Sequence, residues 1–388
     1  MKVCILTLGC KTNLAESDDL KRRLLSKGHE IVDLKDKPNI CIINTCSVTA
    51  KSDYQSRQLI RRALKTGAKV MVTGCYAQLD EDRIQDISSE IEIFKNDEKS
   101  LLLDKIIDDS ESTAIKITDR SRPFVKIQEG CSHKCTYCII PALRGRPKSR
   151  PPEDIIDEIL DYERAGYDEV VLTGIHIGLY GVDLKDGMDL TGLIEQIVLK
   201  TSRARIRLSS LEVIEIDKRF LEVFSEKRIC KHLHIPLQSG SEGVLKRMKR
   251  PYNTIRYERK VKEIYDRFDN ISLGTDVIVG FPGETEEEFE ETLRFLKKLP
   301  INYMHVFPYS DRPGTEASKM PDKVPNNVKR NRAKRLRELD KTKRSEYRRA
   351  QIGRTLEVLQ ESLTEEGKIK GKSENYLDVI FEKKDFEP

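Results

Sequence analysis

Short apolar runs alternate with charged, amphipathic stretches throughout the N-terminal part of the chain. Each apolar run has the length of a β-strand, and the stretches between them repeat apolar residues at helical spacing. Strands and helices in alternation predict a doubly wound α/β domain, a parallel sheet with helices on both faces. The predicted strands are residues 2–8, 30–34, 40–45, 69–73 and 92–94, and the predicted helices are residues 17–27 and 54–66.

Three of these predicted strands end in loops that carry a cysteine, namely Cys10, Cys46 and Cys75. In an open α/β sheet the ligand site lies beyond the carboxyl ends of the strands. These cysteines are distant in the sequence, and we therefore expect them to converge at one edge of the sheet. A buried free cysteine is common in protein cores, so each of the three taken alone would be interpreted as structural.

A second series of strands and helices follows a polar segment at residues 108–122, which we interpret as a linker. Six strand–helix units fit a partial or complete β/α barrel, whose site lies at the carboxyl ends of its strands. A basic helix and a β-rich tail come next, so we expect four segments at residues 1–118, 119–325, 326–350 and 351–388. The predicted barrel strands are residues 124–128, 169–173, 205–209, 232–236, 272–279 and 303–307, with helices at 152–165, 190–200 and 286–298.

The cysteine count and the hydropathy limit the class of protein. The 388 residues include nine cysteines, an odd number, and the apolar run at the N-terminus is too short for a secretory signal. A disulfide framework is therefore not expected, and the thiols are more typical of metal binding or nucleophilic chemistry in the cytoplasm. No apolar stretch approaches the length of a membrane span. We expect a soluble cytoplasmic protein without a membrane partner.

One cysteine motif decides the chemical class. Cys131, Cys135 and Cys138 follow directly on a predicted strand with the spacing C-x3-C-x2-C. Three thiolates can ligate three corners of a [4Fe–4S] cluster, which leaves the fourth iron open to a small molecule. A structural zinc site normally has four protein ligands. His133 is a candidate for the fourth ligand, but it lies inside the tight loop between the thiolates, so zinc is the minor alternative.

This motif, with Tyr137 before its last cysteine, resembles the radical S-adenosylmethionine (SAM) superfamily. The resemblance covers roughly residues 124–312. It implies that the open iron binds SAM, and that an electron from a low-potential donor cleaves SAM to methionine and a 5′-deoxyadenosyl radical. Segments at the ends of the following strands match that superfamily in order. The SAM contacts that the resemblance implies are Tyr137, Thr173, Gly174, Ser209, Ser210, Glu212, Gln238 and Asp276.

The contexts of Cys10, Cys46 and Cys75, such as Gly9-Cys10-Lys11-Thr12-Asn13, resemble the N-terminal domain of the methylthiotransferases. In that family the three cysteines hold a second [4Fe–4S] cluster, and the domain order is the one predicted here, ending in a small RNA-binding TRAM domain. The resemblance implies that one SAM methylates a sulfur on the second cluster while another SAM supplies the radical. We interpret the remaining cysteines as packing residues: Cys4, Cys41 and Cys230.

Within that family, the Cys10 motif and residues 172–181 look most like the MtaB type. This resemblance implies a tRNA substrate, in which C2 of N6-threonylcarbamoyladenosine beside the anticodon receives a methylthio group. The alternatives are the same chemistry on isopentenyladenosine in tRNA or on a ribosomal protein. An alternative of another class is a two-cluster iron–sulfur electron-transfer protein. The SAM-binding segments argue against that last alternative, because an electron carrier needs no SAM pocket.

Positive charge is concentrated near the C-terminus, although the net charge is only +5. Residues 329–349 contain eleven Lys and Arg against three Asp and Glu. A basic helix on a nearly neutral body suggests a polyanion partner, and we expect it to contact phosphates of a tRNA anticodon stem-loop. A solvated helix face is the plain alternative. The residues expected to contact RNA are Arg144, Arg146, Lys148, Arg150, Arg330, Arg332, Lys334 and Arg337.

The tail from residue 352 onward begins like a TRAM domain, with Gly353 and the polar run at residues 370–375. TRAM is a small β-barrel, and the strands that close such a barrel are not evident in this tail. We therefore expect an incomplete TRAM-like β domain, in which the edges of the strands are left exposed.

Overall fold

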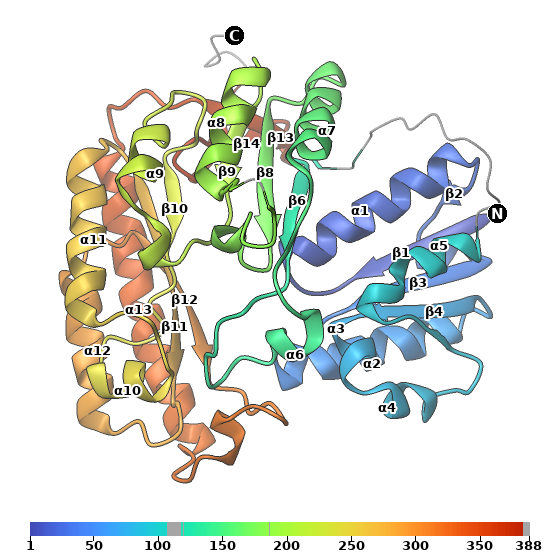
Figure 1. Cartoon of the computed structure of the whole chain (residues 1–388), viewed down its shortest axis with the longest axis horizontal. Helices are drawn as coiled ribbons and strands as arrows, with labels where there is room; N and C mark the ends of the chain where they lie inside the picture. The colour runs from blue at the N-terminus through green and yellow to red at the C-terminus, as the bar shows by residue number, and fades with distance from the viewer. Residues whose placement is uncertain (107–117, 119, 186, 383–388) are drawn as a thin grey trace.

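The computed structural model describes residues 1–106, 118, 120–185 and 187–382. Its first part is a five-stranded sheet in the order β2-β1-β3-β4-β5, in which every neighbouring pair is parallel. The doubly wound α/β prediction is confirmed (Figure 1). β2 is shorter than predicted because the chain enters a 3-10 helix at Leu34–Asp36. The strands are β1 (Lys2–Thr7), β2 (Glu30–Ile31), β3 (Ile40–Thr45), β4 (Lys69–Gly74) and β5 (Glu92–Ile93).

Helices cover both faces of this sheet. α1 (Lys11–Ser26) packs on one face and α2 (Ala50–Leu64) on the other, and both begin earlier than predicted. α2 begins early because Thr49 and Ser52 form a reciprocal cap, each side chain accepting a hydrogen bond from the other's backbone N–H. These early starts bring the helix N-termini to the cysteine loops. The shorter helices are α3 (Cys75–Leu79), α4 (Glu81–Gln85) and α5 (Lys99–Asp104).

The second part is a partial β/α barrel, as predicted. β6, β8 and β9 form one parallel ladder and β10, β11 and β12 form another. A single bridge between Ile206 and Ile229 connects the two ladders, and the additional strand β7 runs antiparallel to β6. The strands are β6 (Phe124–Glu129), β7 (Lys148–Ser149), β8 (Glu169–Gly174), β9 (Arg205–Leu208), β10 (His232–His234), β11 (Ser272–Val279) and β12 (Tyr303–Pro308).

Alternate residues of the barrel strands build the main hydrophobic core. Val125 and Leu172 point outward and pack against the surrounding helices. Their sequence neighbours therefore face the lumen, because successive side chains of a strand point to opposite faces. Those lumen residues are largely polar, as Arg207 illustrates. The helices around the barrel are α6 (Ile140–Arg144), α7 (Pro152–Arg164), α8 (Leu190–Lys200), α9 (Lys218–Val223), α10 (Glu242–Arg247), α11 (Thr254–Arg267) and α12 (Glu286–Lys298).

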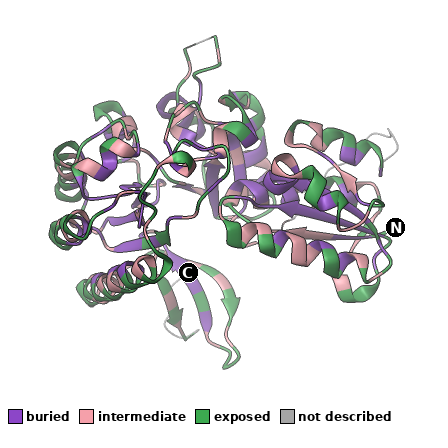
Figure 2. Cartoon of the chain, turned by 90° about the horizontal axis from the view of Figure 1, so that it is seen from below, coloured by how far each residue is buried: buried purple, intermediate pink, exposed green. Residues whose placement is uncertain are grey.

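A long helix and a small sheet complete the described chain. α13 (Asn326–Ala350) packs along β12 and α12. It leads to an antiparallel sheet of β13 (Val358–Leu363), β14 (Ile369–Ser373) and β15 (Asp378–Phe381), which projects from the body in Figure 2. Arg207 ties this sheet to the barrel, because its Nη2 donates to the Ser373 carbonyl at 3.0 Å. The TRAM-like nature of the sheet stays a prediction.

The segment predicted to be a linker falls mostly outside the described residues, so the segment boundaries at residues 118 and 325 stay predictions as well. Cys4, Cys41 and Cys230 are buried, in agreement with their interpretation as packing residues. Within the described ranges, no helix is both long enough and apolar enough to cross a membrane.

Candidate functional site

The three motif cysteines lie in the loop between β6 and α6, at the carboxyl ends of the barrel strands. Gly130 opens this loop with a φ of 76°, and a Cβ there would lie 2.0 Å from the carbonyl oxygen of Arg146. Only glycine fits this close approach. The backbone N–H of Cys131 then donates to the carbonyl of Gly145 at 3.1 Å, which closes the loop around the thiols.

Hydrogen-bond donors point at the sulfurs of this loop. The backbone N–H of His133 lies 3.4 Å from Cys131 Sγ, and Arg250 Nη1 lies 3.1 Å from Cys135 Sγ. Burial raises the pKa of the Cys138 thiol to about 12. A bound metal would therefore be needed to stabilise a thiolate there. Three thiols in one loop, with donors aimed at sulfur, fit the cluster that the motif predicts.

Cys10, Cys46 and Cys75 converge at the carboxyl edge of the N-terminal sheet, as their positions after strands predicted. Cys10 is the N-cap of α1, Cys46 follows β3, and Cys75 is the first residue of α3. A Cβ on Gly9 would lie 2.8 Å from Cys46 Cβ, so the Cys10 and Cys46 loops nearly touch. Burial raises the pKa of the Cys46 thiol, and the neighbouring Cys75 and Cys10 raise it further. The three thiols form a second donor set that fits a metal cluster.

Arg144 connects the two cysteine sets. It follows the motif loop in the sequence, and its Nε donates to Cys75 Sγ at 3.4 Å. Its Nη2 donates to Asn13 Oδ1 at 2.6 Å, and its Nη1 lies 2.6 Å from Glu16 and 2.5 Å from Glu129. The prediction that Arg144 contacts RNA is wrong, because its guanidinium is fully buried and already has protein acceptors.

Glu16 is the centre of this buried charge network. Lys99, Lys126 and Arg144 all pair with its carboxylate. Burial alone would raise the pKa of Glu16, but the three cations lower it well below its ordinary value. Glu16 belongs to α1, whereas Lys126 and Arg144 belong to the barrel, so the network holds the N-terminal sheet against the barrel.

A cavity of about 250 Å³ lies between the N-terminal sheet and the mouth of the barrel. Val48 and Thr49 line it beside Cys46, and Cys138 lines it from the motif loop. A molecule bound in this cavity would contact Cys138 and the loop that follows Cys46. The remaining lining residues are Tyr137, Ile139, Ile140, Gln238, Asp276, Ile278, Phe307, Pro308, Tyr309 and Ser310.

The residues predicted to contact SAM lie around the mouth of the barrel. Asp276 accepts hydrogen bonds from His234 Nε2 at 2.9 Å and from His305 Nδ1 at 3.1 Å. Burial opposes ionisation of Asp276, but the two histidines lower its pKa well below its ordinary value. Glu212 pairs with Arg250. The other predicted contacts are Tyr137 and Gln238 on the cavity wall, Thr173 and Gly174 at the end of β8, and Ser209 and Ser210 after β9.

Among the other residues predicted to bind RNA, Arg332 requires a second correction. It is buried, and its guanidinium lies 2.7 Å from Glu284 and 3.0 Å from Glu286. It therefore anchors α13 to the barrel and is not available to phosphate. Arg150 is half-buried and pairs with Glu158 at 2.7 Å. The exposed candidates are Arg146, Lys148, Arg330, Lys334 and Arg337.

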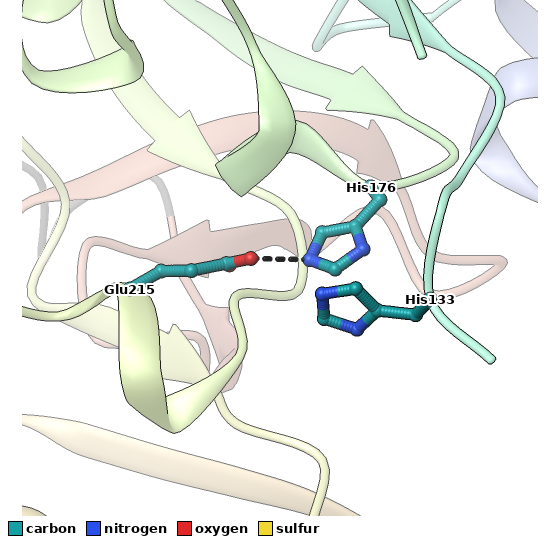
Figure 3. Close-up of side chains that lie close together, drawn as sticks. All are labelled: His133, His176 and Glu215. Carbon is teal, nitrogen blue, oxygen red and sulfur yellow. Dashed lines mark hydrogen bonds and ion pairs between the residues drawn. The ribbon is translucent and has the colours of Figure 1, made fainter. Parts of the chain in front are cut away.

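Sequence reasoning missed a histidine that contacts the motif loop. His176 Nδ1 lies 3.4 Å from Cys131 Sγ. Its Nε2 lies 2.5 Å from Glu215 Oε1 (Figure 3). The ring of His133 meets the His176 ring edge-on, with 4.5 Å between centroids. Burial alone would lower the pKa of His176, but its hydrogen bonds to Cys131 and Glu215 raise it to about 10. No local sequence pattern indicates this pair, because His176 follows β8 whereas Glu215 lies in a 3-10 helix after β9.

Lys11 is a further functional candidate whose role the sequence left open. Within the described part of the chain its side chain has no hydrogen-bond or ion-pair partner. Burial, Arg207 and Arg122 lower its pKa to about 8, and Lys11 in turn contributes to the lowered pKa of His232. The Lys11 ammonium therefore lies close enough to Arg207 and His232 to affect their ionisation, and it is mostly protonated at neutral pH.

Two family models match the chain. The model of the radical SAM superfamily matches residues 125–296, which contain the motif loop and most of the barrel. The model described as "Uncharacterized protein family UPF0004" matches residues 2–95, which contain the other three clustered cysteines. Each cysteine set thus lies within a separately matched region.

Curated relatives match over nearly the whole chain. Threonylcarbamoyladenosine tRNA methylthiotransferase MtaB of Aquifex aeolicus is 39% identical, covering 98% of this chain and 96% of that protein. Its namesake in Bacillus subtilis is 38% identical, covering 98% and 90%. The tRNA-2-methylthio-N(6)-dimethylallyladenosine synthase of Protochlamydia amoebophila is 32% identical, covering 98% and 90%.

Solved structures share the fold at low sequence identity. The radical SAM methyltransferase TsrM from Kitasatospora setae has a TM-score of 0.60 at 15% identity, covering 82% of this chain and 75% of that one. The cobalamin-dependent SAM radical enzyme OxsB has a TM-score of 0.54 at 14% identity, covering 98% and 65%. At such identities the likeness concerns the arrangement of the α/β sheet and the barrel alone.

Replacing Arg144 by Met should test the buried charge network. We expect the free energy of unfolding to fall by about 3–5 kcal/mol, because Glu16 and Glu129 lose a cation that they share in the interior. We expect a value near 3 kcal/mol, about the lower end of this range, because Lys99 and Lys126 still pair with Glu16. Urea denaturation measures the change, and Arg146→Met at an exposed position is the matched control. Equal, small losses in both variants would contradict a stabilising role for the network.

Proposed function

Because this chain belongs to the radical SAM tRNA methylthiotransferases, we propose that it adds a methylthio group to C2 of N6-threonylcarbamoyladenosine in tRNA, beside the anticodon. As a member of that family it is an enzyme that uses SAM and a [4Fe–4S] cluster. The observation that carries the proposal is the cavity between the two cysteine sets, in a chain whose MtaB relatives match it almost from end to end.

The residues around the cavity have distinct proposed roles. When bound at Cys131, Cys135 and Cys138, the cluster supplies the electron that cleaves SAM. Tyr137, Gln238 and Asp276 line the cavity and would hold SAM beside that loop. Its apolar walls would exclude water from the reacting carbon, while the fold brings the reactants together. The further proposed SAM contacts are Thr173, Gly174, Ser209, Ser210 and Glu212.

We assign a second [4Fe–4S] cluster to Cys10, Cys46 and Cys75. Their convergence supports this, as does the glycine at position 9, where any side chain would collide with Cys46. Cys10, Cys46 and Cys75 would hold this cluster, which would carry the sulfur that one SAM methylates, and the motif loop would hold the SAM that supplies the radical for removal of hydrogen from C2. The role of the protein is to hold the adenine between the two cysteine sets.

The position and charge of Lys11 support the assignment of threonylcarbamoyladenosine as the substrate. The threonylcarbamoyl group ends in a carboxylate, whereas a dimethylallyl group is wholly apolar. Within the described residues the partly buried Lys11 ammonium has no ion-pair partner. The neighbouring Arg122, Arg205 and Arg207 all pair with Glu169, and Arg122 and Arg205 pair in addition with Glu361 and Glu357. An anion is therefore favoured on this side of the lumen. Dimethylallyladenosine and ribosomal-protein substrates are the alternatives that the test below addresses.

The exposed basic residues would contact the tRNA, with Arg146 and Lys148 after the motif loop and Arg330, Lys334 and Arg337 on α13. We also propose a cytoplasmic location, and a low-potential electron donor that SAM cleavage requires.

The direct test of function is mass spectrometry of tRNA nucleosides from cells with and without the protein. Loss of 2-methylthio-N6-threonylcarbamoyladenosine is expected. Loss of only the dimethylallyl derivative, or of a modification on a ribosomal protein, would contradict the proposal.

Variants of the two cysteine sets should lose different steps of the reaction. The reconstituted protein should hold about eight irons, four at each site. Replacing Cys131, Cys135 and Cys138 by Ala should halve the iron and abolish SAM cleavage to 5′-deoxyadenosine. Gly9→Ala should also halve the iron, by displacing Cys46, but leave SAM cleavage intact and give no methylthiolated product. Gly28→Ala is the matched control, because Gly28 has a positive φ with no atom near its missing Cβ.

Retention of eight irons by Gly9→Ala would contradict the second-cluster assignment. Release of 5′-deoxyadenosine by the triple cysteine variant would contradict the assignment of the first cluster.

Lys11→Gln should raise KM for tRNA carrying threonylcarbamoyladenosine by roughly 10–100-fold, because a charged hydrogen bond contributes about 1.5–3 kcal/mol. Lys11→Arg should retain most of the affinity. The same tRNA with the threonine carboxylate esterified is the matched substrate, and the Gln substitution should change its KM little. An equal rise in KM for both substrates would contradict recognition of the carboxylate. Iron content serves as the check that the Cys10 site is intact.

The basic face of α13 should govern RNA affinity through phosphate contacts. Replacing Arg330, Lys334 and Arg337 by Gln should weaken tRNA binding and reduce its salt dependence, by a slope of roughly 0.7–0.9 per lost contact. Binding to unrelated RNA should weaken similarly, because phosphate contacts carry no base information. The control variant replaces three exposed cations of α9 and α11, namely Lys218, Arg256 and Lys262. Unchanged tRNA affinity would mean that the face is merely solvated.

A further inference from the structure

We propose that His176 sets the reduction potential of the cluster at Cys131, Cys135 and Cys138, through a hydrogen bond to the Cys131 sulfur that Glu215 orients. In this proposal His176 is a positioning residue, since it contacts a cluster ligand and neither the substrate nor the reacting atoms. The inference rests on the cluster at the motif loop. It does not depend on which modified adenosine the enzyme accepts.

The His176 ring lies between two acceptors. Its Nδ1 is 3.4 Å from Cys131 Sγ. Its Nε2 is 2.5 Å from Glu215 Oε1 (Figure 3). A cysteine that binds iron is a thiolate, and both a thiolate and an ionised carboxylate accept hydrogen bonds without donating any. Two acceptors require a proton on each ring nitrogen, so the ring donates its Nδ1–H to the sulfur and its Nε2–H to the carboxylate. Carboxylates behind histidines fix ring orientation in the same way at metal sites.

The surrounding residues hold this pair independently of any substrate. A Cβ on Gly178 would lie 1.8 Å from Glu215 Oε2, so the absence of a side chain there makes room for the carboxylate. The backbone N–H of Glu212 donates to the same oxygen at 3.0 Å. The backbone N–H of His176 donates to Gln128 Oε1 at 2.9 Å. His176 and Glu215 are thus each held by a backbone hydrogen bond in addition to the one between them.

Hydrogen bonds to the ligating sulfurs are among the factors that set the reduction potentials of iron–sulfur clusters. Reduction adds one electron, supplied here by the external low-potential donor, and so adds negative charge at the cluster. An N–H aimed at a ligand sulfur stabilises that added charge and raises the potential. Arg250 makes a comparable contact to Cys135 at 3.1 Å, so His176 accounts for one part of this stabilisation.

Two substitutions at His176 separate the hydrogen bond from the shape of the ring. His176→Phe keeps a flat ring but has no N–H, and His176→Gln keeps an N–H donor. We would titrate each holoprotein against potential and follow the reduced clusters by electron paramagnetic resonance. The signal that changes when SAM is added reports the Cys131 cluster. For His176→Phe, its reduced-to-oxidised ratio at fixed potential should fall about tenfold, which equals about 59 mV for one electron. His176→Gln should lie between this variant and the wild type.

Gly178→Ala tests the same pair without touching the histidine. The new methyl group would displace Glu215, and we expect a smaller shift toward lower potential. Iron content and the SAM-insensitive signal should stay unchanged in all three variants. A general structural defect would instead lower the iron content or alter that second signal. An unshifted SAM-sensitive signal in His176→Phe would overturn the proposal. A wild-type holoprotein without any SAM-sensitive signal would overturn it together with the assignment of the motif cluster, while leaving the nucleoside analysis as a separate test of function.

Discussion

The buried ion-pair network around Glu16 is the interaction on which the site depends. Its members come from α1, α5, β6 and α6, so the network is complete only when the N-terminal sheet is docked on the barrel. A charge removed from water is costly unless it is paired. Docking in any other arrangement would leave Glu16 paired with Lys99 alone and Arg144 paired with Glu129 alone, and the loss of the remaining pairs favours one relative position. Because Arg144 also contacts Cys75, that position sets the distance between the two cysteine sets.

The two cysteine sets differ in how they are encoded, and this explains how much of the site could be predicted. Cys131, Cys135 and Cys138 lie in one loop, so their spacing alone indicates a metal cluster. Cys10, Cys46 and Cys75 become neighbours only through the order of the parallel strands. The alternation of strands and helices was sufficient to predict that convergence, because the carboxyl ends of parallel strands meet at one edge. The residues that fix the sets relative to one another left no such local pattern.

Both corrections concern arginines in basic runs. Arg144 and Arg332 have cationic sequence neighbours, and a basic run is typical of an exposed face. Each of them instead pairs with carboxylates from another element, Arg144 with Glu16 on α1 and Arg332 with Glu284 before α12. Such pairing depends on the packing of distant segments. The same limit applies to His176 and Glu215, which two different strand ends bring together.

The charge distribution in the barrel implies a direction for the substrate. At the mouth, the walls of the cavity are largely apolar and lie between the two cysteine sets. Deeper in the lumen, Arg122, Arg205 and Arg207 pair with Glu169, Glu361 and Glu357, and the surplus of positive charge among the described residues there is that of Lys11. An adenine at the mouth would place its N6 substituent toward this surplus, where a carboxylate is stabilised. C2 of the same ring would then remain at the mouth, where the cysteine loops meet. A single orientation of the adenine would thus account both for selectivity toward the N6 substituent and for access to C2.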